Sequence, residues 1–315
     1  MIKVSVLNEG VVQAGGTELL DAPGSARWID VENTDAEELG ELGRRFGLHK
    51  LAVEDCLHQD QRPKLEEYPN HLFLVLNGFT HEAADICELT LHEHHFFIGP
   101  TWIISVHALP FSGVQNVWRR VQDDPAATLG RGPDFIAYLV ADALVDQSFP
   151  ILDHLNDELE NLEVEIFERP ESGQLQRIFA LKRMLVHFRR VLSPQRDVVS
   201  LLSREGLPHL GQRNVIYFRD IYDHLVRVYE QIDSGRDLLG NAMDGYLSMV
   251  ANRTNDITKQ LTIFSTIFLP LSFITGFFGQ NFDVLSGAGF FWLMMSTVVA
   301  LPVGLIVWFR RKGWF

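Results

Sequence analysis

Small and polar residues recur at helical spacing in the last third of the chain, and their types can line a water-filled path. Steps of four and three residues trace a set, here called the polar stripe, in which only Leu269 is large and apolar: Asp244, Ser248, Ala251, Asn255, Thr258, Thr262, Ser265, Leu269, Ser272 and Gly276. This spacing places the polar stripe on one face of an α-helix. Hydroxyl and amide oxygens can hold the waters of a hydrated cation, but small residues also favour close helix packing. The stripe alone leaves both interpretations open.

Two charge-free segments place part of the polar stripe in a membrane. Residues 261–278 and 290–309 are 18 and 20 residues long and carry no charge, and a bilayer core about 30 Å thick needs about 20 helical residues. Hydroxyls inside a bilayer must face another helix or water. One helical hairpin cannot enclose an ion path, so a pore along the stripe requires a homo-oligomer. Leu269 would then form an apolar constriction.

The basic residues predict the orientation of these spans. Arg253 and Lys259 precede the first span, three basic residues at 310–312 follow the second, and the connection 279–289 has none. The positive-inside rule therefore predicts a multi-pass protein of the cytoplasmic (inner) membrane with both termini cytoplasmic. The start of the chain, MIKVSVLNEG, is not a secretory signal.

Composition excludes several classes of protein. The formal charge of the whole chain is −14, so nucleic acid is not expected as a partner. The last part differs from the rest, because residues 250–315 carry five basic and two acidic side chains. Two cysteines fit a reducing compartment rather than a disulfide framework. We find no phosphate loop, nucleophile elbow or HExxH motif, so we expect neither an enzyme nor a cofactor.

The residue patterns predict a cytoplasmic α/β domain followed by long helices. Short apolar runs at 71–79 and 96–106 are typical of strands, and residues 35–47 are typical of a helix that starts near Asp35 and stops at Gly47. Helical spacing begins after residue 133, with breaks expected at Pro170, Gly173, Pro194 and 206–208. We therefore divide the chain as follows: 1–130, α/β domain; 131–213, cytoplasmic helices; 214–278, a long stalk helix of about 100 Å that continues as the first span; 279–289, external loop; 290–309, second span; 310–315, basic tail.

The segment directly after the first span resembles a known family. Gly279-Gln280-Asn281-Phe282-Asp283 is similar to the Gly-Met-Asn signature of the CorA family of divalent-cation (magnesium and cobalt) channels, and the stretches at 55–68, 138–152, 217–225 and 252–279 match as well. The resemblance implies a funnel-shaped homopentamer whose external loop is the selectivity filter, at Gly279, Gln280 and Asn281. It also implies the pore-facing positions Asp244, Asn255, Thr258, Leu261, Ser265, Leu269, Ser272 and Gly276. At one turn the polar stripe has Thr262 where the resemblance has Leu261.

The resemblance also implies a regulatory metal, with magnesium as both transported and regulatory ion. Acids that hold subunits together in the closed state fall on Asp220 and, on the α/β domain, on Glu82, with Asp85 as the weaker candidate. Asp244 falls at the cytoplasmic pore entrance, and Asp283 lies beyond the filter. A solvated carboxylate is the alternative at each position.

Gln280 departs from the family pattern, which has methionine there, and it leaves the preferred ion open among magnesium, cobalt, nickel and zinc. The alternatives are a proton-linked zinc transporter of the same superfamily and a membrane-anchored assembly that does not conduct. His92, His94 and His95 lie in a predicted strand, where they suit either a soft-metal site or a solvated strand face.

Overall fold

The structure is a computed structural model that describes residues 1–33, 35–58, 60–81, 89–280 and 287–314. These residues form two compact units, 1–165 with 171–243 and 166–170 with 244–315. The units divide the chain differently from the predicted ranges. The sheet and the helical residues 131–165 and 171–243 belong to the same unit.

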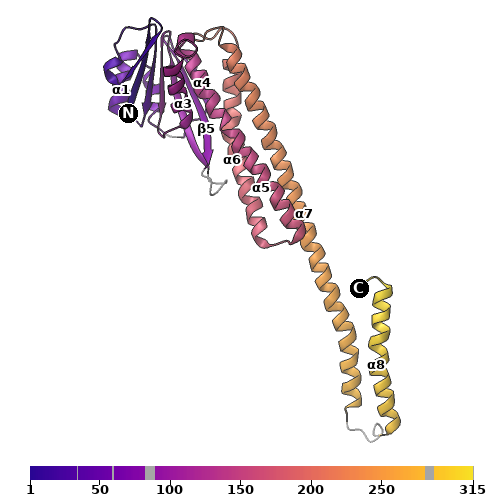
Figure 1. Cartoon of the computed structure of the whole chain (residues 1–315). Helices are drawn as coiled ribbons and strands as arrows, with labels where there is room; N and C mark the ends of the chain where they lie inside the picture. Colours follow the sequence, from indigo (N-terminus) through magenta and orange to yellow (C-terminus); the bar gives the residue numbers. More distant parts are fainter. Residues whose placement is uncertain (34, 59, 82–88, 281–286, 315) are drawn as a thin grey trace. The chain divides into compact units, whose positions relative to one another are not determined.

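A seven-stranded mixed sheet forms the centre of the first unit (Figure 1). Its strands follow in the order β2-β1-β3-β7-β6-β5-β4, and among these pairs only β3 and β7 run parallel. The bounds are β1 Ile2–Asn8, β2 Val11–Gly15, β3 Ala26–Glu32, β4 Lys64–Glu67, β5 Leu72–His81, β6 Leu89–Ile98 and β7 Trp102–His107.

Both faces of the sheet are covered. On one face α1 (Ala36–Phe46) and α2 (Lys50–Asp55) contribute Leu39, Leu42 and Ala52 to a core shared with β-strand residues such as Ile29 and Phe97. The other face is covered by α4 (Pro133–Asp146), which contacts β3, β5, β6 and β7, with α3 (Ser112–Asp123) packed beside it. Burial on both faces explains the continuous apolar runs of the central strands.

The ends of α1 follow from its capping residues. The side chain of Asp35 accepts hydrogen bonds from the backbone N–H groups of Glu37 and Glu38, both at 2.9 Å. At the other end Gly47 has φ +65°, which a residue without Cβ adopts readily. The helix predicted at 35–47 is thereby confirmed.

The apolar run at 96–106 contains parts of two strands rather than one. It begins in β6, turns at residues 99–101 and ends in β7. The backbone N–H of Gly99 donates to the carbonyl of Trp102 at 2.8 Å, and a Cβ on Gly99 would lie 2.3 Å from the indole of Trp102. The turn therefore requires glycine at position 99, because the indole of Trp102 lies where a Cβ would be. The apolar pattern of the sequence does not reveal this contact.

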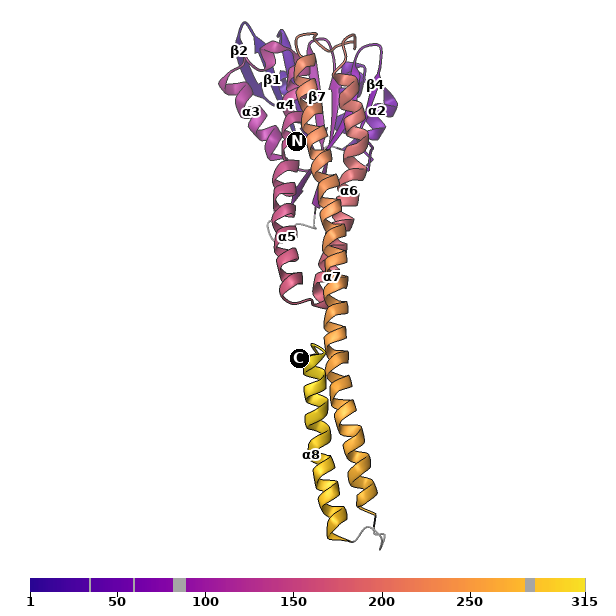
Figure 2. The same ribbon diagram turned by 90° about the vertical axis from the view of Figure 1, so that its right-hand side faces the viewer.

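Three long helices complete the first unit. These are α5 (Ser148–Glu168), α6 (Ser172–Leu202) and the part of α7 (Val215–Phe278) before residue 244, and they run alongside one another in both views (Figures 1 and 2). At Gly235 of α7 an added Cβ would lie 3.3 Å from the side chains of Leu155 and Leu185. Three helices therefore meet at this glycine. Pro170 and residues 206–208 lie between helices as predicted, whereas Gly173 lies in the first turn of α6.

Pro194 does not break α6, contrary to the prediction. The helix continues to Leu202 although proline cannot donate to the carbonyl of Arg190. Buried neighbours on both sides, Leu192 and Val198, hold the helix in place. The side chain of Gln195 also accepts a hydrogen bond from the backbone N–H of Asn77 at 2.7 Å. Tertiary packing thus outweighs the local cost of the proline.

The second unit contains the rest of α7 and the helix α8 (Ala288–Arg311), which runs beside it in both views (Figures 1 and 2). Pro270 and Pro302 lie inside these helices. Phe309 of α8 is 2% exposed, and its ring is tilted against that of Trp314 with 5.2 Å between the ring centroids.

Candidate ion path and regulatory metal site

Among the described residues, three helical segments are long and apolar enough to cross a membrane. In Pro133–Glu168, 61% of the apolar window is buried inside the first unit, so α4 and α5 are core helices. The corresponding windows of α7 and α8 are 6% and 0% buried. These two helices present their apolar surface outward, as membrane spans do.

The polar stripe lies on the side of α7 away from α8. Ile263 is buried and Ile267 and Ile274 are half-buried, and α8 is the helix that runs beside this part of α7 (Figures 1 and 2). The residues two positions after these isoleucines, Ser265, Leu269 and Gly276, are exposed, and Leu269 is 71% exposed. Two residues correspond to a rotation of about 200° around a helix. The stripe is therefore free to face copies of itself or water.

The remaining predicted pore-facing residues of α7 are exposed as well. Asp244, Asn255, Thr258, Ser272 and both alternatives at the disputed turn, Leu261 and Thr262, are accessible. Because both residues are exposed, the structure of one chain does not decide whether Leu261 or Thr262 faces the pore. Near the start of the apolar segment of α7, a shallow pocket of about 490 Å³ is lined by Asn252, Asn255, Asp256, Thr258, Lys259, Thr262 and Trp314.

Threonine hydroxyls along this part of α7 donate to their own helix. The hydroxyl of Thr258 donates to the carbonyl of Thr254 at 2.8 Å, and that of Thr262 donates to the carbonyl of Thr258 at 2.7 Å. A hydroxyl whose proton is used in this way offers only its oxygen lone pairs to other groups. These oxygens therefore present acceptors, which suit the waters of a hydrated cation.

The predicted filter begins where α7 ends. The backbone N–H of Gly279 donates to the carbonyl of Thr275 at 2.9 Å, and that of Gln280 donates to the carbonyl of Phe277 at 3.3 Å. The side chain of Gln280 is exposed. Asn281 and Asp283 lie outside the described residues, so the position of the filter amide stays a prediction.

Asp220 lies in a cluster of metal-ligand types. Donor atoms of Asp142 on α4 and of Asp220 and His224 on α7 are all within 4.8 Å of one another. A fourth group, Asp146, has its Oδ1 atom 3.5 Å from Nδ1 of His224. Asp220 is exposed, whereas Asp142 and His224 are half-buried. The cluster is therefore open on the side of Asp220.

The electrostatics of this cluster favour a bound cation. Burial, together with the nearby charges of Asp146 and Asp220 and against the opposing effect of His224, raises the pKa of Asp142 to about 6. Oδ1 of Asp142 and Nδ1 of His224 are buried and have no hydrogen-bond partner among the described residues. Carboxylate oxygens suit magnesium, directly or through its waters, and the imidazole also suits cobalt, nickel or zinc. The residues present thus fit a divalent ion.

Sequence reasoning found Asp220 but missed Asp142 and His224. Asp142 and Asp146 are spaced i, i+4, as are Asp220 and His224, so each pair shares a helix face. That spacing was a usable signal, but only the packing of α4 against α7 brings the two faces together. Glu82 and Asp85, the candidates on the α/β domain, lie outside the described residues.

The three histidines of β6 do not form one site. His92 and His94 share the face of the sheet that packs against Phe111, while His95 lies on the other face, near Phe73. All three are buried, at 7%, 0% and 4% exposure, so the solvated strand face expected as the alternative is wrong. The cause is the cover of both sheet faces by helices.

Two outward-facing apolar helices together with an α/β domain are the elements of a membrane protein with a large extramembrane part, and its group of Asp142, Asp220 and His224 could hold a metal ion. The sequence profile of the CorA-like Mg²⁺ transporter protein family matches residues 23–311. The chain belongs to this family.

Relatives agree with this assignment over nearly the whole chain. The chain is 33% identical to the cobalt/magnesium transport protein CorA of Thermotoga maritima, over 91% of this chain and 83% of that protein. It is 26% identical to the zinc transport protein ZntB of Yersinia pestis, over 94% of this chain and 90% of the relative. The structure of the CorA magnesium transporter from Methanocaldococcus jannaschii superimposes with a TM-score of 0.86 at 25% identity, covering 100% of this chain and 99% of that one.

Proposed function

We propose that this protein transports divalent metal cations, chiefly magnesium with cobalt or nickel as further cargo, through a central path in a homopentamer that cytoplasmic metal binding closes. The observation that carries the proposal is the exposed polar stripe of α7, opposite α8, in a chain of the CorA-like family.

The middle of α7 is exposed in the single chain, and this exposure indicates that further copies of the chain cover it. Between residues 247 and 262 no side chain is buried, and Leu247, Ile257 and Leu261 are 52%, 59% and 65% exposed. An isolated helix is marginal in water, and exposed apolar side chains of this size favour association. Copies of α7 around one axis would cover these residues and turn the polar stripe inward. The number five rests on the family resemblance.

The basic residues support a cytoplasmic (inner) membrane location with both termini in the cytoplasm. Arg310 and Arg311 lie in the last turn of α8, where they complement the helix dipole as well as the cytoplasmic surface. Arg253 and Lys259 lie on the same side of the first span. The segment around Gln280 then faces the outside.

Conduction through such a path uses neutral oxygens. Magnesium gives up its water shell reluctantly, so it passes as a hydrated ion whose waters donate to acceptors on the wall. The hydroxyl oxygens of Thr258, Ser265 and Ser272 are such acceptors. Leu269 forms the apolar constriction, which stops flow when the ring is narrow enough to lose its water.

Selection takes place at Gly279, Gln280 and Asn281, with magnesium held through its waters by amide and backbone oxygens. A neutral filter binds the ion weakly enough to release it. Carboxylates on either side, Asp244 within and Asp283 outside, raise the local cation concentration.

Gating uses the cluster of Asp142, Asp220 and His224. The open side at Asp220 is available to an acid of a neighbouring copy, and Glu82 is the candidate. A bound magnesium ion would offset the repulsion between these carboxylates and hold the ring closed, and loss of the ion at low cytoplasmic magnesium would release it.

Flux into proteoliposomes of the pure protein tests the proposal. Wild-type protein should carry magnesium, and the flux should fall to background when Asn281 is replaced by alanine. Flux that is absent in the wild type, with the protein folded and inserted, would favour the non-conducting assembly instead.

A proton-linked zinc transporter is the second candidate, favoured by Gln280 in the filter and by the similarity to ZntB. An imposed pH gradient distinguishes the two. Zinc entry that depends on the gradient supports the zinc transporter, and magnesium entry that ignores it supports the channel.

A further inference from the structure

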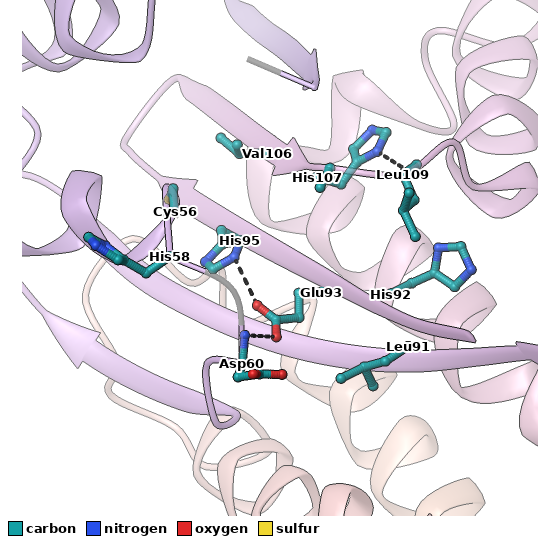
Figure 3. Close-up of a pocket in the computed structure, with 11 residues that line it drawn as sticks. Cys56, His58, Asp60, Leu91, His92, Glu93, His95, Val106, His107 and Leu109 are labelled. Atoms are coloured by element: carbon teal, nitrogen blue, oxygen red, sulfur yellow. Dashed lines mark hydrogen bonds and ion pairs between the residues drawn. The ribbon is translucent and has the colours of Figure 1, made fainter. Parts of the chain in front are cut away.

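A pocket opens in the sheet where β7 ends. His107, the last residue of β7, pairs with His94 of β6, so residues 91–93 of β6 have no described strand on that side. The pocket has a volume of about 290 Å³ and lies in the first unit, apart from the cluster of Asp142 and His224 on α4 and α7. Its lining residues are Cys56, His58, Asp60, Leu91, His92, Glu93, His95, Val106, His107, Ala108 and Leu109 (Figure 3).

Three metal-ligand types from two segments meet in this pocket, Cys56 at the end of α2 and Glu93 and His95 on β6. Figure 3 shows the ring of His95 between the side chain of Cys56 and the carboxylate of Glu93. Nε2 of His95 lies 3.8 Å from Oε2 of Glu93. Burial, together with the nearby charge of Asp55 and against the opposing effect of Lys64, raises the pKa of the Cys56 thiol, so the thiol keeps its proton until a metal displaces it.

His95 is a buried side chain of β6 whose ring lies near that of Phe73. Its side chain is 4% exposed, and its Nδ1 atom has no hydrogen-bond partner among the described residues. Burial lowers the pKa of His95 to about 4, so the ring is neutral at cellular pH, the form that binds metals. An unpartnered polar atom in a buried site is unfavourable, because it has lost its hydrogen bonds to water without gaining a partner. A ligand that accepts its lone pair would offset this cost.

We propose that Cys56, His95 and Glu93 bind a thiophilic divalent metal ion, zinc or cobalt. Sulfur and nitrogen ligands favour these ions strongly over magnesium. Binding forms a bond from the metal to Cys56 Sγ, and the thiol proton passes to solvent.

The side chains must draw together to close this site. The metal-free distances exceed 4.8 Å for at least one pair of the three donors, and Sγ of Cys56 donates to the carbonyl of Ala52 at 3.2 Å. Rotation of the Cys56 side chain would give up this thiol hydrogen bond and leave the backbone N–H of Cys56 bonded to the same carbonyl.

Cobalt absorption spectroscopy on the full-length, reduced protein in detergent with saturating magnesium tests the proposal. A cobalt–thiolate bond gives a near-ultraviolet charge-transfer band that oxygen and nitrogen ligands do not give. We expect one cobalt equivalent per chain to produce this band and zinc to abolish it.

The variants identify the ligands. Cys56→Ser should lose the band, and His95→Gln should weaken cobalt binding, while Cys87→Ser, which removes the other cysteine, and Asp220→Ala should keep the band. Equal elution volumes and equal magnesium-dependent stabilisation confirm that Cys56→Ser is folded. No band in the wild type, a band retained in Cys56→Ser, or a band lost with Cys87 would overturn the proposal.

Discussion

Oδ1 of Asp142 lies 3.9 Å from Nδ1 of His224, and neither atom has a hydrogen-bond partner among the described residues. Asp142 comes from α4, which covers the sheet, and His224 comes from α7, which continues toward the membrane. A cation between them would therefore connect the α/β domain to the helix that carries the polar stripe.

Asp142→Asn should weaken the response to magnesium. Removing one carboxylate from the cluster lowers its charge, and because loss of even an indirect ligand contact typically costs 10-fold or more, we expect the magnesium concentration that gives half-maximal protection from protease to rise at least about tenfold. Limited proteolysis at graded magnesium concentrations measures this. Asp223→Asn is the matched control, because Asp223 is an exposed acid on α7 outside the cluster. Equal curves for Asp142→Asn and the control would contradict the assignment.

The raised pKa of Asp142 predicts how stability depends on pH without metal. Because burial chiefly raises this pKa to about 6, the folded protein binds the proton more tightly than the unfolded chain, whose aspartate titrates near its ordinary value. Asp142 therefore adds stability at low pH and loses that contribution as pH rises through about 6. In EDTA at neutral pH, Asp142→Asn should melt at a higher temperature than the wild type.

Saturating magnesium should reverse that order. Differential scanning fluorimetry of both proteins, in EDTA and in magnesium, at about pH 5 and pH 8 measures the effect. The difference in EDTA should shrink at the lower pH, where Asp142 is protonated in the wild type as well. A wild type that is the more stable protein in EDTA at pH 8 would refute the electrostatic account.

Leu269→Asn should leave the path conducting when magnesium is high on the cytoplasmic side. An amide at position 269 hydrogen-bonds water, so the constriction formed by the copies of this residue stays filled with water in the closed state and no longer blocks the ion. We expect flux at inhibitory magnesium to rise severalfold in proteoliposomes. Leu269→Met, which preserves volume and apolarity, should behave as the wild type does. If both variants close normally, the constriction lies elsewhere.

Gln280→Met should change the choice of ion. A thioether cannot hydrogen-bond the waters of magnesium as an amide does, and it is a softer ligand that tolerates cobalt. The ratio of magnesium to cobalt flux should therefore fall, measured by competition in one preparation. An unchanged ratio would show that Gln280 takes no part in selection.

Much of the fold could be predicted from local signals. The helix at 35–47 is set by the Asp35 cap and the Gly47 stop, and the helix predicted from 214 to 278 is α7, Val215–Phe278. One prediction failed, the break at Pro194, and one detail of the predicted strands, the turn inside residues 96–106, was not visible in the apolar pattern. Pro194 stays helical because α6 is held by buried neighbours, and the run at 96–106 splits because Gly99 turns against Trp102.

The functional residues, too, were predictable from the sequence only where the signal is local. By itself the sequence determined the two charge-free segments, the polar stripe and Asp220, because hydropathy and the 3.6-residue helical period are local properties of the chain. Only the tertiary structure decided that Asp142 and His224 join Asp220, that the stripe faces away from α8, and that His92 and His95 lie on opposite faces of a covered sheet. These relations depend on how separate elements pack, and no periodicity within one segment records the neighbour against which it will lie.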